Sequence, residues 1–377
     1  MPHLFGRDCT RAELARRFGS SSQVFGVRLA TLGDGPERGV RVLTFRTGTG
    51  LGFEVMVDRG FDIGSVTYGG AAIGWHSPTG FRSPWLHEAD SEQGLGWLRS
   101  FSGFMNTCGL DHVMGPASEP ADHYNYPYRR TVEHGLHGRA AYIPARLVGY
   151  GERWDGDRCV LWCEGEVVQA AVFGENLHLT RRIEAEVGTS VITVSDRVEN
   201  RGFRRTPHAL NYHVNIGWPV VDEGTLFLAP VRRTVWTAHT PGATAVGPQV
   251  QAAPQRDFRE QVYAYETAPG PDGLVPAALV NKALTLADGT RGLGFLLEFD
   301  PRQLPALWQW QNLQEGDYVV GIEPCTVFPG TREEQKARGE IRWLEHGQGC
   351  DYGLRFSVVA GHVGIEALAR RIEAIGR

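Results

Sequence analysis

The sequence lacks the features that would assign it to a membrane, secreted or nucleic-acid-binding class. No segment approaches the roughly 18 consecutive apolar residues of a membrane span. Residues 1–11 contain no basic stretch followed by an apolar one, so we expect no secretory signal. The formal net charge is −5 and no run of Lys or Arg is present, which disfavours a nucleic-acid partner. We therefore expect a cytoplasmic protein that contacts neither membrane nor nucleic acid.

Paired cysteine spacing is also absent. The six cysteines are scattered, so without a secretory signal they are predicted to be free thiols in a reducing compartment. Cys159 and Cys163 would share one face of a strand, where core packing is a simpler explanation than redox chemistry. The six positions are Cys9, Cys108, Cys159, Cys163, Cys325 and Cys350.

The chain shows neither the helix–strand alternation of a parallel sheet nor an internal repeat, and no long linker divides it. Its 48 glycines, 10 tryptophans and 17 phenylalanines are typical of many short strands joined by turns. We expect an all-β fold, a single antiparallel domain over residues 1–377. Short helices are predicted near residues 10–18, behind a Thr10–Glu13 capping box, and at residues 362–376.

Several segments alternate polar and apolar residues as half-buried strands do. The clearest pair is a hairpin turning at Val187-Gly188-Thr189. The predicted strands are Arg41–Thr47, Phe53–Asp58, Leu177–Ala185, Val191–Glu199, Leu293–Phe299, Tyr318–Glu323 and Gly353–Val359.

Two strands carry an ionisable residue among apolar neighbours. In the segment from Leu210 to Gly217, alternation places Tyr212 and Val214 on one face and His213 on the other, together with Asn211 and Asn215. Glu323 follows Tyr-Val-Val-Gly-Ile at a strand end. An ionisable group in an apolar strand requires a partner or a task. The alternatives are a satisfied core histidine and an exposed polar sheet face, whereas a facing histidine and carboxylate could move two protons together.

Four segments, in order along residues 55–330, together resemble motifs of the galactose mutarotase (aldose 1-epimerase) superfamily. The resemblance is closest to the aldose-epimerase-like branch of that superfamily. The Tyr212–Asn215 segment resembles the family's histidine motif. Glu323-Pro324, with Phe328-Pro329-Gly330, resembles its strand-end glutamate. The other two are Leu98–Gly103, which resembles the arginine segment, and Leu136–Arg139, which resembles the Leu-His-Gly segment.

The resemblance implies a large antiparallel β-supersandwich and an isomerase that interconverts the anomers of an aldose or modified sugar. Glu323 would take the anomeric hydroxyl proton and His213 would protonate the ring oxygen, with no metal or cofactor. Arg99 and His137 would hold sugar hydroxyls or stabilise charge. The expected partner is a small-molecule sugar, bound by a monomer or homodimer.

Three further residues are predicted to bind substrate. Arg139 could hold an anion, and Asn215 lies on the polar face of the His213 strand. In Trp308-Gln309-Trp310-Gln311, alternation puts both tryptophans on one face, where Trp310 would be either a sugar platform or the edge of the core.

The chain departs from the family pattern at two places. The usual sugar-binding aspartate has no clear counterpart, with Asp257 and Asp300 as candidates. A long loop over residues 111–135 contains His112, His123 and His134, which would either bind a metal or contact sugar and solvent. The alternative functions are therefore a sugar isomerase or lyase, with or without metal assistance, and a non-catalytic sugar-binding protein.

A last motif, Asp58-Arg59-Gly60-Phe61-Asp62, places acids and an arginine at a tight turn. We interpret it as a structural ion pair, with a role in binding as the alternative.

Overall fold

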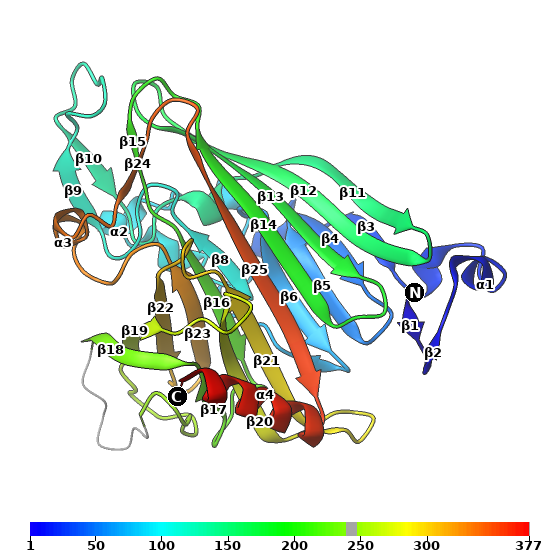
Figure 1. The fold of residues 1–377 in the computed structure, drawn as a ribbon. Helices are drawn as coiled ribbons and strands as arrows, with labels where there is room; N and C mark the ends of the chain where they lie inside the picture. The colour runs from blue at the N-terminus through cyan, green and yellow to red at the C-terminus, as the bar shows by residue number, and fades with distance from the viewer. Residues whose placement is uncertain (239–246, 377) are drawn as a thin grey trace.

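The chain forms three large antiparallel sheets in a computed structural model that describes residues 1–238 and 247–376 (Figure 1). The largest sheet has eight strands, and its long central strands hydrogen-bond over most of their length. In spatial order they are β11 (Arg146–Asp155), β12 (Arg158–Ala170), β13 (Asn176–Glu186), β14 (Val191–Asn200), β25 (Gly349–Ala360), β21 (Arg291–Phe299), β20 (Val275–Thr285) and β17 (Leu226–Leu228).

Two smaller sheets complete the fold. The six-stranded sheet consists of β18 (Val231–Ala238), β19 (Gln261–Thr267), β22 (Ala306–Asn312), β23 (Val319–Cys325), β16 (Asn211–Gly217) and β8 (Met105–Cys108). The five-stranded sheet consists of β3 (Gly26–Thr31), β4 (Arg41–Arg46), β5 (Leu51–Met56), β6 (Asp62–Tyr68) and β7 (Ala71–Ala72).

Short elements decorate these sheets. Three two-stranded ribbons pair β1 (His3–Leu4) with β2 (Arg7–Asp8), β9 (Ala117–Pro120) with β10 (Thr131–His134), and β15 (Thr206–His208) with β24 (Arg342–Leu344). The α-helices are α1 (Arg11–Ala15), α2 (Ser91–Gly94), α3 (Arg332–Ala337) and α4 (His362–Gly376). The 3₁₀ turns are η1 (Ser21–Gln23), η2 (Gly35–Glu37), η3 (Pro84–Leu86), η4 (Gly96–Arg99) and η5 (Ala140–Tyr142).

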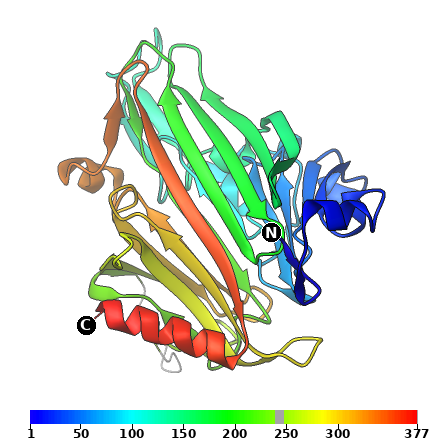
Figure 2. The same ribbon diagram turned by 45° about the vertical axis from the view of Figure 1, so that its right-hand side comes forward.

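One apolar core joins residues from all three sheets, so the eight-stranded sheet packs against the other two. Figure 2 shows the five-stranded sheet, in blue, beside strands β11 to β14, in green. The C-terminal helix α4 lies across β20 and β21, where Ile365, Leu368 and Ile372 pack on Ala278 and Leu296. The predicted apolar stripe of this helix is therefore its buried face.

The core also holds a buried ion-pair cluster centred on Arg181 of β13. Its guanidinium donates to Asp196 Oδ2 at 2.6 Å and contacts the carboxylate of Asp62. Tyr212 of β16 donates its hydroxyl to the same Asp196 oxygen at 2.7 Å. The carboxylates and the guanidinium are almost fully buried from solvent, which strengthens their hydrogen bonds. This cluster therefore fixes the position of β16 on the eight-stranded sheet.

The Asp58–Asp62 turn is structural, although its acids and arginine do not pair with one another. Asp58 binds Arg41, with Nε to Oδ1 at 3.0 Å. Arg59 donates to the hydroxyl of Ser100 at 2.6 Å. Asp62 belongs to the Arg181 cluster.

The predicted all-β architecture with terminal helices is confirmed. The Thr10–Glu13 capping box opens α1, and the predicted hairpin is β13 and β14 in antiparallel register. All six cysteines are free. Among the described residues, no helix combines the length and apolarity needed to cross a membrane.

Candidate active site

The six-stranded sheet brings His213 and Glu323 together on adjacent strands. In β16, Tyr212 and Val214 point into the core, as alternation predicts, and His213 points the other way. Strand β23 pairs with β16 such that Val214 lies opposite Ile322. His213 Nε2 consequently lies 3.3 Å from Glu323 Oε1, and both side chains are almost fully buried.

Two asparagines of β16 orient this pair. Asn211 Nδ2 donates to Glu323 Oε2 at 2.9 Å. Asn215 Nδ2 donates to the Gly103 carbonyl at 3.0 Å, which leaves its Oδ1 facing His213 Nδ1 at 2.6 Å. His213 therefore carries its proton on Nδ1 when neutral, and Nε2 presents a lone pair to the carboxyl of Glu323.

Burial sets the protonation of the pair. Removal from water raises the pKa of Glu323 to about 8, against the opposing hydrogen bond from Asn211. Burial, with nearby His137 adding to it, lowers the pKa of His213 well below its ordinary value. At neutral pH the pair therefore holds one exchangeable proton, on the carboxyl, next to a ring nitrogen that can accept it.

The pair opens into a cavity of about 390 Å³. Its walls are mainly apolar and aromatic, as in most small-molecule sites. A larger hollow of about 600 Å³ lies over β4 and β5, but its described lining contains one carboxylate and no histidine. The residues that line the smaller cavity are Leu95, Trp97, Leu98, Phe101, Met114, Gly115, Pro116, Leu136, His137, His213, Trp236, Glu260, Val262, Trp308, Trp310 and Glu323.

His137 and Trp310 line this cavity, where the sequence places substrate contacts. Trp310 shares its face of β22 with Trp308, and its indole N–H donates to Glu260 at 2.8 Å. The His137 ring lies 5.8 Å from the His213 ring.

His137 has two marks of a functional position. Its φ of 58° is uncommon for a non-glycine residue, and a backbone hydrogen bond to Met114 of 2.8 Å holds it there. Its Nδ1 atom is buried without a partner. Burial lowers the pKa of His137 to about 3, with a contribution from His112, so the ring is neutral.

Three predicted substrate contacts are not among the described residues that line the cavity. Arg99, at the end of η4, is exposed and pairs with Glu92 at 2.6 Å. Arg139 pairs with Asp90 at 2.6 Å and with Glu175 at 3.3 Å. Asn215 is fully buried behind His213, so it positions the histidine.

Sequence reasoning missed two kinds of cavity residue. Trp97 and Phe101 lie two residues before and after Arg99, and they line the cavity, whereas Arg99 is not among its described lining residues. The rings of Trp97 and Phe101 stack with their centroids 4.0 Å apart. Glu260, directly before β19, is the acid between the histidine and glutamate segments that lines the cavity.

The two candidate aspartates are not in the cavity lining. Asp300 pairs with Arg302 at 2.6 Å, and Asp257 lies in the turn before β19. The family pattern specifies an aspartate, so it does not single out the nearby glutamate, Glu260.

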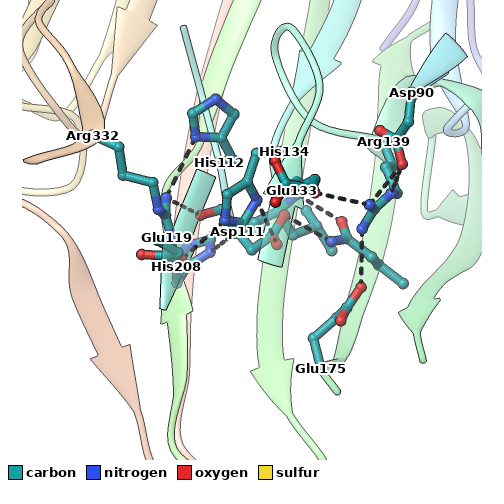
Figure 3. Close-up of polar contacts among 12 residues, drawn as sticks. Asp90, Asp111, His112, Glu119, Glu133, His134, Arg139, Glu175, His208 and Arg332 are labelled. Carbon is teal, nitrogen blue, oxygen red and sulfur yellow. Dashed lines mark hydrogen bonds and ion pairs between the residues drawn. The ribbon is translucent and has the colours of Figure 1, made fainter. Parts of the chain in front are cut away.

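The histidine loop contributes to a buried polar cluster (Figure 3). His134 Nε2 lies 2.9 Å from Glu119 Oε1, and its Nδ1 lies 3.4 Å from Asp111 Oδ2. Arg332 of α3 donates to Glu119 at 2.8 Å and to the Asp111 carbonyl at 2.8 Å. The rings of His112 and His134 stack at 4.8 Å.

Both ring nitrogens of His134 face carboxylates, which is the geometry of an imidazolium. Burial lowers the pKa of His134, but the hydrogen bonds to Asp111 and Glu119 raise it by more, so the net shift is upward. In the described ranges, no group of three or more His, Cys, Asp or Glu side chains is arranged to hold a metal ion. The cluster instead ties the β9–β10 hairpin to α3, and the chain on either side of that hairpin supplies Met114 and His137 to the cavity.

Solved structures of similar fold carry names from carbohydrate chemistry. A Klebsiella pneumoniae protein described as a "putative aldose 1-epimerase" has a TM-score of 0.80 at 24% identity, covering 95% of this chain and 91% of its own. A galactose mutarotase-like protein from Clostridium acetobutylicum has a TM-score of 0.56 at 10% identity, covering 89% and 99%. Galactose 1-epimerase from Lactobacillus acidophilus has a TM-score of 0.52 at 11% identity, again covering 89% and 99%.

These likenesses define the class: the protein has the galactose mutarotase-like β-sandwich fold, as its sequence motifs predict. Residues 37–358 match the family model described as "Domain of unknown function (DUF4432)", and the chain belongs to this family. No curated protein matches the sequence.

Proposed function

We propose that this protein is a cofactor-independent sugar epimerase of the mutarotase type. The observation that carries the proposal is the His213–Glu323 contact of 3.3 Å at the wall of an aromatic cavity. One proton shared by two sites makes one acid and one base available, which is what concerted ring opening requires.

In the proposed reaction, one member of the pair takes the proton from the anomeric hydroxyl. The C1–O5 bond breaks, its electrons pass to O5, and the other member protonates O5 while C1 becomes a carbonyl. Rotation about C1–C2 turns the carbonyl over. The O5 proton then returns to the protein, O5 attacks C1, and the carbonyl oxygen regains a proton, so the pair ends as it began.

The pKa shifts place the shared proton on Glu323. The resemblance-based roles, Glu323 as base and His213 as acid, therefore require that substrate binding moves this proton to His213. Since every step moves a proton between oxygen and nitrogen atoms, positioned groups can supply roughly 10²–10⁴-fold each.

The second candidate is carbon-acid chemistry at the same site, as in a sugar isomerase. A buried carboxyl whose pKa is raised to about 8 is a stronger base once deprotonated than an ordinary carboxylate. The two reactions differ in whether a carbon-bound hydrogen exchanges with solvent.

Proton NMR in D₂O on a panel of aldoses tests both candidates. Exchange between anomeric signals, with no deuterium entering carbon positions, supports mutarotation. Entry of deuterium at C2 would instead support the isomerase reaction and refute simple mutarotation. Glu323→Gln and His213→Asn should each abolish catalysed exchange, and full activity in both variants on a converted sugar would refute the assignment.

A further inference from the structure

The cavity lining is poor in hydrogen-bonding side chains. Among the described residues, sixteen line it and four of these carry ionisable groups: His137, His213, Glu260 and Glu323. Most of the rest are leucine, methionine, proline, phenylalanine and tryptophan.

Four tryptophans line the cavity in the described ranges, and two of their indole N–H groups already donate to protein acceptors, whereas the buried N–H of Trp97 has no partner. Trp308 donates to the Val327 carbonyl at 3.1 Å, and Trp310 donates to Glu260 at 2.8 Å. These two tryptophans therefore present their ring faces, but not a spare donor, to a ligand.

The described lining contains no Lys or Arg. Its acids are the carboxyls of Glu260 and Glu323. The cation predicted for this site, Arg99, is bound to Glu92 at the surface. An anionic group in the cavity would therefore find no Lys or Arg as a counter-charge among the described lining residues.

The mutarotase reaction occupies two of the four ionisable groups, because His213 and Glu323 act at the anomeric hydroxyl and ring oxygen. His137 and Glu260 are the other ionisable contacts for a ligand. A fully hydroxylated aldohexose also carries hydroxyls at carbons 2, 3, 4 and 6. A hydroxyl buried against apolar side chains loses water without a replacement partner, which lowers affinity roughly tenfold to a hundredfold.

We propose that this cavity selects an uncharged, partly deoxygenated aldose and excludes sugars that carry a phosphate or carboxylate. A methyl or methylene in place of a hydroxyl would lie against the wall formed by Leu98, Met114 and Leu136. The inference rests on the proposed function, because that function assigns His213 and Glu323 to the anomeric centre.

A series of sugars that differ at single carbons tests the selection. D-Galactose, 6-deoxy-D-galactose, galactose 6-phosphate and galacturonate differ at carbon 6, and ribose and 2-deoxyribose differ at carbon 2. Anomeric exchange is measured by NMR, and binding is measured separately by quenching of tryptophan fluorescence. We expect at least one deoxy sugar to exceed its parent tenfold in kcat/KM, with both anionic sugars at the uncatalysed rate.

The outcomes separate this inference from the proposed function. Faster exchange of the parent or the anionic sugars than of either deoxy sugar overturns the selection and leaves the function intact. Tenfold tighter binding of a deoxy sugar with no exchange of any sugar supports the selection and refutes the function. If no sugar binds and no sugar shows catalysed exchange, both the selection and the proposed function are overturned.

A charge-introducing variant probes the electrostatic part. Leu98 lines the cavity yet is 53% exposed, so Leu98→Arg should be tolerated and place a cation at the wall. Leu86 is 56% exposed and does not line the cavity, which makes Leu86→Arg the matched control. We expect at least tenfold higher kcat/KM for galacturonate in Leu98→Arg alone; an equal effect in both variants, or none, contradicts the reasoning.

Discussion

Replacement of Glu323 by glutamine tests whether the carboxyl of the pair is protonated in the folded protein. Glutamine keeps the shape and can still contact Asn211 and His213, but it does not titrate. Because the pKa of Glu323 is about 8 in the folded protein, against an ordinary value of 4.5, the unfolded chain binds fewer protons from pH 5 to pH 8. The wild type therefore loses stability relative to Glu323→Gln as pH rises through this window.

The size of the effect follows from the shift. Each pH unit within the window changes the free energy of unfolding by about 1.4 kcal/mol for one proton. Between pH 5 and pH 7 the stability of the variant relative to wild type should rise by roughly 2–3 kcal/mol. Both proteins retain His213, so to first order its own titration cancels in the difference.

Urea unfolding at half-unit steps from pH 5 to pH 7.5 measures this difference. Glu92→Gln is the control, since the hydrogen bond from Arg99 lowers the pKa of that exposed carboxyl and its linkage lies below pH 4.5. The difference in free energy of unfolding between Glu92→Gln and wild type should therefore stay constant from pH 5 to pH 7.5. A flat difference for Glu323→Gln would mean that the buried carboxyl is ionised, and the shared-proton description would be abandoned.

Three further predictions concern the site and its support. The pH profile of kcat/KM should fall above about pH 8, where Glu323 loses the shared proton, and stay level to well below pH 6 because His213 resists a second proton; loss of activity near pH 6.5 would contradict this. Asn215→Leu should lower kcat roughly tenfold or more with little change in KM, since Nδ1 of His213 loses its acceptor, and Asn215→Asp should restore part of it in the same kinetic assay. His134→Leu should cost roughly 3 kcal/mol in urea unfolding near pH 6, because it leaves two buried carboxylates without the imidazolium. The His134 contribution is complete below the unfolded pKa of 6.5 and decreases as pH rises through the higher folded pKa, so equal losses at pH 6 and pH 9 would refute it.

In the six-stranded sheet, one face carries the candidate site and the other face packs in the core. Odd and even positions of β16 serve different purposes: Tyr212 anchors the strand to the Arg181 cluster, and His213 faces the cavity. The geometry of the His213–Glu323 pair is thereby fixed by core packing on the opposite face.

Much of this arrangement was present in local sequence pattern. Period-two alternation predicted several of the strands, put His213 on the face opposite Tyr212, and put both tryptophans of β22 on one face, because successive side chains of a pleated strand alternate. The Thr10–Glu13 box determined the start of α1, since its hydrogen bonds lie within four residues. The motifs shared with mutarotases predicted that His213 and Glu323 would belong to one site.

Only the tertiary structure decided what pattern cannot encode. Whether Arg99 reaches a ligand depends on Glu92 and on the path of the chain through η4, and the aromatic neighbours of that arginine took its predicted place. Glu260 entered the cavity because β19 lies next to β22, a pairing of strands far apart in sequence. The protonation of Glu323 likewise depends on burial, which is set by packing from many segments. The sequence by itself determined the faces and the candidates, and long-range contacts decided which candidates meet.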